Sequence, residues 1–189
     1  MASQGPNLPS TSANDSAVGT ESWGSIANIK IEDGATATAS ATPGLSLVTR
    51  YAKVTAFGFS IPSGATIDGI VVEVKGRASH NSGTTYVKDT TVKLVKAGTV
   101  VGSNKADTVT KWPTTLTFVT YGGSSDLWGT TWTDTDINDA TFGFVISATM
   151  TEGAKVFSSA RIDVIKITVY YTTGGGGGAS TNPILYIGN

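Results

Sequence analysis

The sequence contains no cysteine and only one histidine, and both scarcities remove classes of chemistry. Without cysteine the chain forms no disulfides and holds no zinc or iron–sulfur cluster through thiolates. The single histidine, His80, cannot build a multi-histidine metal site or pair with a serine nucleophile in a recognisable triad. We therefore expect a protein that is not an enzyme and that has no cofactor.

Charge is also sparse, at 14% of residues with a formal net charge of −1. The 13 basic residues are spread singly along the chain, so they form no stripe for a phosphate backbone, and we expect no nucleic acid partner. No run reaches the roughly 18 apolar residues of a membrane helix, and we expect no membrane partner. The opening stretch MASQGPNLPSTSANDS lacks the basic and apolar regions of a secretory signal, which favours synthesis in a cytoplasm.

Glycine is abundant and good helix formers are few, a balance typical of all-β proteins with many turns. The clearest strand pattern lies in residues 54–78, where Ile70, Val72 and Val74 fall on one face and Glu73, Lys75 and Arg77 on the other. Residues 141–150 alternate in the same strict way. Turn residues separate these stretches, with no helical pattern between strands, which favours antiparallel pairing. The sequence predicts an all-β fold, an antiparallel two-sheet β-sandwich.

The chain divides into four parts by composition. Residues 1–20 are small and polar and predict an extended N-terminal arm, whereas residues 21–173 carry the strand patterns of the sandwich domain. Residues 174–178 are five consecutive glycines, a flexible linker. We interpret the apolar segment 179–189 as a docking tail that adds a strand to a sheet edge of another subunit. The alternatives are that it folds back onto its own sandwich or stays disordered. The docking residues are Ile184, Leu185, Tyr186 and Ile187.

One helical turn is predicted from Asp134 to Asp139, with Thr133 or Asp134 as its N-cap. The carboxylates of Asp134, Asp136 and Asp139 are also a candidate calcium site, since hard oxygen ligands gather there. Their spacing does not fit an EF-hand loop, so we favour a solvated, capped turn with no metal.

Four aromatic residues are candidate ligand contacts, since rings on sandwich loops stack on sugars. These are Trp112, Tyr121, Trp128 and Trp132. The alternative is that the rings close the open ends of the sandwich. The sugar interpretation gives a second candidate function, a carbohydrate-binding module or a receptor-binding adhesin that contacts a host-surface glycan from an extracellular location.

Four stretches of the chain resemble small β-sandwich structural proteins of tailed bacteriophages and prophages. They are GPNLPSTSANDSAVGTESWGS, FGFSIPSGATIDGIVVEVKGRAS, DLWGTTWTDTDINDATFGFVISA and ARIDVIKITVYYT. The resemblance implies a jelly-roll-like virion structural protein that serves as a capsid decoration, a tail component or a fibre. The glycine linker and the apolar tail lie outside the matched stretches, so the extended N- and C-terminal arms of the sandwich are predicted from composition. It implies partners that are copies of itself and other virion proteins, and a location in the virion after synthesis in the host cytoplasm.

Overall fold

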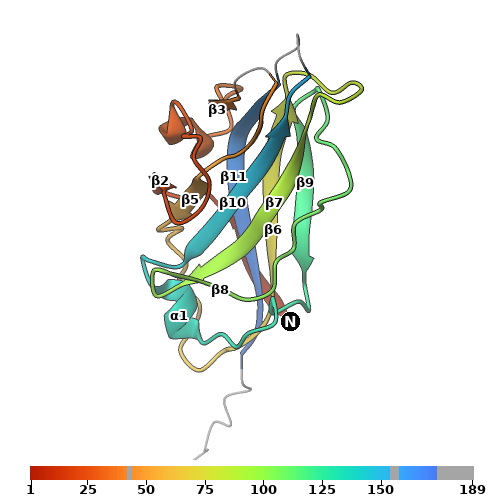
Figure 1. The fold of residues 1–189 in the computed structure, drawn as a ribbon. Coiled ribbons are helices and arrows are strands. Elements are labelled where there is room, and N and C mark those ends of the chain that lie inside the picture. Colours follow the sequence, from red (N-terminus) through yellow and green to blue (C-terminus); the bar gives the residue numbers. More distant parts are fainter. Residues whose placement is uncertain (42–43, 154–157, 174–189) are drawn as a thin grey trace, which may run out of the picture.

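The computed structural model describes residues 1–41, 44–153 and 158–173. Strands dominate it, and Figure 1 shows them arranged in two layers. The elements are β1 (Ala2–Asn7), β2 (Thr11–Asp15), the 3₁₀ helix η1 (Ile26–Ile29), β3 (Ala37–Ser40), β4 (Ser46–Val48), β5 (Tyr51–Thr55), β6 (Thr66–Ala78), β7 (Tyr86–Lys96), β8 (Thr99–Val101), β9 (Thr117–Gly123), α1 (Asp134–Asn138), β10 (Gly143–Thr151) and β11 (Ser159–Thr172). No helix among the described residues is long and apolar enough to cross a membrane.

The strands form two antiparallel sheets. The first sheet has the order β1-β11-β6-β9, with β3 also paired to β11, and the second has the order β2-β5-β10-β7-β8, with β4 also paired to β10. Four of the strand pairs follow one another as in a long antiparallel ribbon that is rolled into two sheets, which is jelly-roll topology. These pairs are β1 with β11, β5 with β10, β6 with β9, and β7 with β8. The predicted all-β, two-sheet sandwich is confirmed.

The core lies between the inner faces of the sheets and follows the alternation of the sequence. Ile70, Val72 and Val74 of β6 are buried, whereas Glu73, Lys75 and Arg77 of the same strand are half-buried on the outer face. Phe144 and Ile146 of β10 face them from the second sheet and are fully buried. Each such side chain contributes roughly 1.5–3 kcal/mol to the free energy of unfolding, so the core determines which face of each strand points inward.

The N-terminal residues lie within the sandwich, and they are not the separate arm that their composition predicted. Strand β1 pairs with β11, from Ala2 opposite Tyr171 onward. Strand β2 pairs with β5, from Thr11 opposite Thr55 onward. Small polar side chains hide these strands from a hydrophobicity pattern because backbone pairing, rather than side-chain burial, holds them in place.

The one predicted α-helical turn is confirmed, since α1 begins after Thr133, which caps it. The short 3₁₀ helix η1 was not predicted, because its apolar residues resemble the start of a strand. The glycine linker at 174–178, the tail at 179–189 and its docking residues Ile184, Leu185, Tyr186 and Ile187 lie outside the described residues.

Candidate interaction edge

The second sheet is covered along both of its outer sides. On the β2 side, the amide of Asn14 receives a hydrogen bond from the backbone N–H of Trp23 (2.7 Å) and donates one to its carbonyl (2.9 Å). On the β7 side, Val92 donates to the side-chain oxygen of Asn104 (2.8 Å), and its carbonyl accepts from the N–H of Lys105 (2.9 Å). The Val92 contacts occupy backbone groups of β7 that would otherwise pair with another strand, whereas the Asn14 side chain holds the chain around Trp23 beside β2.

The first sheet is covered along one of its two sides. Strand β3 exchanges two backbone hydrogen bonds between Thr38 and Gly24, at 2.8 and 3.0 Å. Next to it, β1 contains Pro6, which has no N–H to donate, and its pairing register shifts between Gln4 and Asn7. Short, interrupted strands of this kind are poor templates for another strand.

Strand β9 forms the opposite side of the first sheet, and it is uncovered. It pairs with β6 from Thr117 opposite Gly76 to Gly123 opposite Ile70, and Figure 1 shows no strand beyond it, only the loop that leads from β8 to β9. Within the described residues, no backbone hydrogen bond reaches the outer edge of residues 117–121. The stretch 114–125 contains no charged residue. We call residues 117–121 the β9 edge.

The two faces of the β9 edge differ. Phe118 points to the outer face of the sheet, where the ammonium groups of Lys75 and Lys166 lie over its ring at 5.5 and 4.8 Å from the centroid. Both lysines also form ion pairs with Glu32. Val119 points to the other face, and Phe118 and Val119 are each 37% exposed, which is unusual for large apolar side chains on a strand without a partner.

A small apolar hollow of about 70 Å³ lies on the inner side of the β9 edge. Trp112, Pro113, Val119 and Tyr121 form the apolar part of its walls, and Asp89, Asp107, Thr110 and Lys111 form the polar part. The hollow can receive part of an aliphatic side chain that points inward from a strand placed beside β9.

Asp89 of β7 holds this corner of the sandwich together. It is 4% exposed and accepts hydrogen bonds from Trp112 Nε1 (2.7 Å), from the Tyr121 hydroxyl (2.9 Å) and from the backbone N–H of Asp107 (3.1 Å). Burial raises the pKa of Asp89, although these three donors oppose the rise. Burial and the nearby Asp89 carboxylate raise the pKa of Tyr121, so its hydroxyl stays protonated and donates. The contact joins the second sheet to β9 of the first.

Sequence reasoning selected Trp112 and Tyr121 as ligand contacts but missed Asp89, the residue that brings them together. The available signal was an acidic residue two positions after Val87, on the apolar face of β7; a register shift after Asp89 brings Val92 onto the same face. A buried acid needs donors around it, and aromatic N–H and O–H groups supply them here.

Trp128 and Trp132, the other two predicted ligand contacts, also lie inside the sandwich. The indole N–H of Trp128 donates to the carbonyl of Ile70 (2.9 Å), and that of Trp132 donates to the carbonyl of Leu127 (3.0 Å). Gly122 makes room for Trp128, since a Cβ there would lie 2.6 Å from the indole nitrogen. All four predicted rings are at most 7% exposed. They offer no open face to a sugar, which favours the alternative that they close the sandwich.

The acidic turn is a helix cap rather than a set of free ligands. Asp136 accepts hydrogen bonds from the backbone N–H and the hydroxyl of Thr133, both at 2.8 Å, and pairs with Lys96 at 2.9 Å. Burial would raise the pKa of Asp136, but the contacts with Lys96 and Thr133 outweigh it and lower the pKa. Asp139 instead accepts from Thr141. Asp134 forms no cluster with them, and no group of three potential metal ligands occurs within the described ranges.

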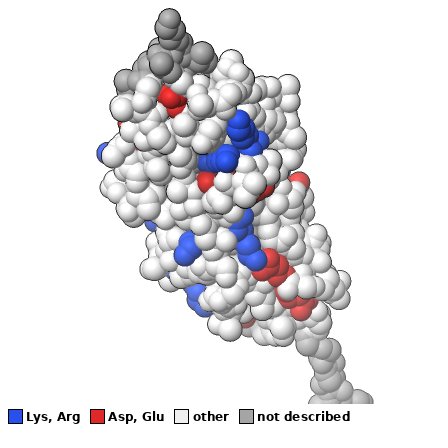
Figure 2. Space-filling model, turned by 45° about the vertical axis from the view of Figure 1, so that its right-hand side comes forward, with Lys and Arg blue, Asp and Glu red and all other residues white. Residues whose placement is uncertain are grey.

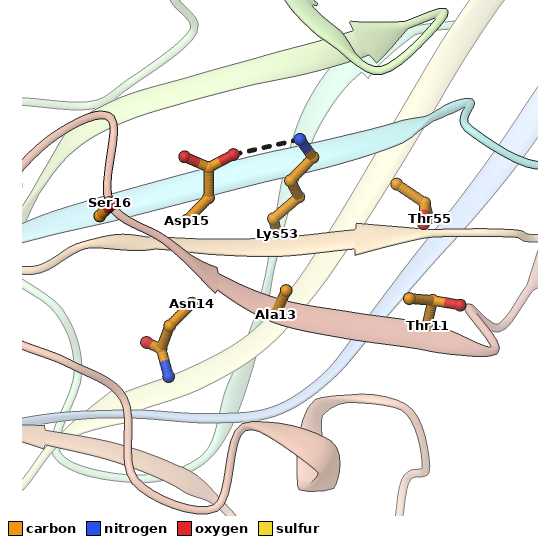
Figure 3. A pocket seen from close by; sticks show the side chains of 7 residues that line it. All are labelled: Thr11, Ala13, Asn14, Asp15, Ser16, Lys53 and Thr55. Carbon is orange, nitrogen blue, oxygen red and sulfur yellow. Dashed lines mark hydrogen bonds and ion pairs between the residues drawn. The ribbon is translucent and has the colours of Figure 1, made fainter.

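A shallow hollow of about 390 Å³ lies over β2 and β5, and Figure 3 shows its lining side chains. Its charged groups already have partners, because Lys53 pairs with Asp15 at 3.1 Å and donates to the carbonyl of Gly98 at 3.3 Å. The Asn14 amide is engaged by Trp23. The charged groups and the amide of this hollow are therefore engaged within the chain, and its other polar side chains are the hydroxyls of Thr11, Ser16 and Thr55.

Charged side chains do not gather by sign on the face that Figure 2 shows. Blue and red groups are few there. Most red groups lie beside blue ones, and the rest of this face is uncharged. His80 is half-buried, and its backbone carbonyl accepts a hydrogen bond from the Ser158 hydroxyl (2.8 Å). This hydroxyl therefore does not donate its proton to the imidazole of His80.

No protein-family model, curated protein or solved structure matches this chain significantly.

Proposed function

We propose that the protein is a non-enzymatic structural component of a bacteriophage particle, and that it assembles with copies of itself and with other virion proteins. The observation that carries the proposal is the β9 edge, a strand with free backbone groups, no charge and two exposed apolar side chains. Such an edge is a template for pairing with another chain.

The contrast between β9 and the other sheet sides supports assembly as its purpose. Folded proteins block their edges with charges, prolines or covering loops, and this chain does so on the other three sides. If β9 had no partner in the assembled state, we would expect it to carry such a block as well. The jelly-roll topology is shared by viral capsid domains, and the resemblance to phage sandwich proteins agrees with that use. Capsid decoration, tail component and fibre remain the three roles within this proposal.

Lysine substitution on β9 tests the assembly role. Val119→Lys places a charge on the edge, as natural edge strands do, and is expected to weaken self-association at least tenfold, about 1.4 kcal/mol. Sedimentation velocity over a range of concentrations measures this change. The matched control is Leu8→Lys, since Leu8 is 43% exposed directly after β1, which lies on the opposite side of the first sheet from β9, and its substitution should leave association unchanged.

Thr120→Lys is a second variant for the case in which Val119→Lys misfolds, because Thr120 is exposed on the same strand. A wild-type protein that stays monomeric at every concentration, or equal association in all three variants, would contradict the role of β9 in self-assembly. Location in a particle is tested separately by mass spectrometry of purified particles. A structural component should be present in many copies, and its absence there would refute the phage assignment.

A further inference from the structure

We infer that the β9 edge binds residues 183–187 of a second copy of this chain as an added strand. The inference rests on the proposed assembly function and names the partner of the same surface. It would make each molecule a donor through its C-terminal segment and an acceptor through β9.

The acceptor surface offers both components of strand addition. The outer backbone groups of residues 117–121 are free to pair, and main-chain hydrogen bonds of this kind provide affinity. The apolar hollow beside Val119 provides a place for a side chain on the inner face. The ring of Phe118 provides apolar contact on the outer face.

The donor segment has the matching chemistry. In an extended chain, Ile184 and Tyr186 point to one side and Leu185 and Ile187 to the other, so both faces of the added strand carry apolar side chains. Residues 183–187 contain no charge, as the β9 edge contains none. Pairing therefore buries apolar surface on both sides and leaves no ion without a partner.

The position at which the described chain leaves the sandwich brings the segment within reach of an edge. Thr172 of β11 lies opposite Thr66, at the same end of the first sheet as Gly123, which lies opposite Ile70. Residues 173–182, fully extended at about 3.3 Å per residue, span about 33 Å. This length includes the five glycines, which adopt backbone conformations closed to other residues.

The same geometry favours a second copy over the molecule's own edge. The chain after β9 crosses this end of the sheet, where Asp126 accepts a hydrogen bond from the N–H of Ile70 (3.0 Å) and Ser124 lies against Gly69. To reach its own β9 edge, the segment would have to reverse direction and pass around this crossing. Continuing along the direction of β11 instead leads away from the molecule, toward a neighbour.

Cross-linking between engineered cysteines tests the assignment, because the natural chain has none. Thr120→Cys marks the acceptor and Tyr186→Cys marks the donor. Equal amounts of the two single variants, treated with a short bismaleimide, should give a cross-linked dimer containing one chain of each. The control mixture of Leu8→Cys with Tyr186→Cys should give at least tenfold less, because Leu8 follows β1 on the opposite side of the first sheet.

The other occupants of the edge give distinct results, and each overturns the inference. If the double variant Thr120→Cys, Tyr186→Cys cross-links within the monomer at high dilution, the occupant of the β9 edge is the molecule's own segment 183–187. Dimers of Thr120→Cys with itself identify pairing between two β9 strands. A mixture of the single variants that gives no more product than the control shows that residues 183–187 do not lie on β9.

Deletion of residues 174–189 separates this inference from the proposed function. We expect the deletion to weaken self-association as much as Val119→Lys does. If Val119→Lys weakens association and the deletion does not, assembly through β9 stands and the donor assignment is wrong. If neither change has an effect, the assembly function fails as well.

Discussion

At the scale of single residues, Asp89 shows how this protein keeps a carboxylate in its interior. Within the described residues Asp89 makes no ion pair, and the donors from Trp112, Tyr121 and the Asp107 backbone partly replace its water. Its pKa is raised by burial above the ordinary value of 3.8. For an acid with a raised pKa, the stabilising contribution is complete below 3.8 and is lost as the pH rises through the folded-state pKa.

Tyr121→Phe tests this contact by removing one donor and leaving the ring in place. We expect a loss of about 1–2 kcal/mol in the free energy of unfolding near neutral pH. The loss should be smaller at about pH 3, because a protonated Asp89 needs fewer donors. Urea unfolding at both pH values measures the difference. Tyr170→Phe is the control, since Tyr170 is half-buried on β11 and no hydrogen bond of its hydroxyl occurs in the described structure. Equal losses for Tyr121→Phe at the two pH values would contradict the account.

At the scale of elements, the sequence predicts strands with two different faces and does not reveal which strand lies at an edge. Strands β6 and β10 follow from strict alternation, and α1 follows from Thr133 and the acidic residues after it. Strands β1 and β2 lack an apolar face and were interpreted as an arm. The β9 edge depends on which strands neighbour it, and that is decided by long-range pairing rather than by residues 117–121 themselves.

The same reason explains the candidate site. The aromatic residues Trp112 and Tyr121 were visible in the sequence, but their burial depends on Asp89, a residue from the other sheet. Composition alone does not distinguish a ring that closes a core from a ring that stacks on a ligand, because both are large, apolar and carry a polar group.

Thr133→Ala tests the cap of α1. Thr133 and Asp136 form a reciprocal capping box, in which each side chain accepts from the backbone N–H of the other. Its removal should lower the free energy of unfolding by about 1 kcal/mol. Thr135→Ala is the matched control, because Thr135 is exposed within the same helix and caps nothing. Chemical denaturation compares the two variants. A loss as large for Thr135→Ala would mean that helix propensity, rather than the cap, determines the stability of this turn.

At the scale of the whole molecule, the N-terminal strands join the two sheets. Residues of β1 belong to the first sheet and those of β2, a few positions later, belong to the second. The chain therefore passes from one layer to the other within its first strands. This arrangement makes the N-terminal segment part of the cooperative unit rather than an appendage.

Hydrogen exchange measured by mass spectrometry tests that cooperativity. We expect the amides of β2 to exchange at least about 100-fold more slowly than those of the exposed loop around Val109, because β2 opens only when the sandwich unfolds. Rapid exchange throughout β2 while β10 stays protected would instead indicate an independently detaching arm.

The pairing of β1 with β11 has a consequence for the birth of the molecule on the ribosome. Ala2 needs Tyr171 as its neighbour, so β1 has to wait until β11 has been synthesised. At about 5–20 residues per second, that wait lasts roughly 10–30 seconds. During this time the backbone groups of β1 have no partner strand in the nascent chain, and this side of the first sheet closes only after β11 has left the exit tunnel.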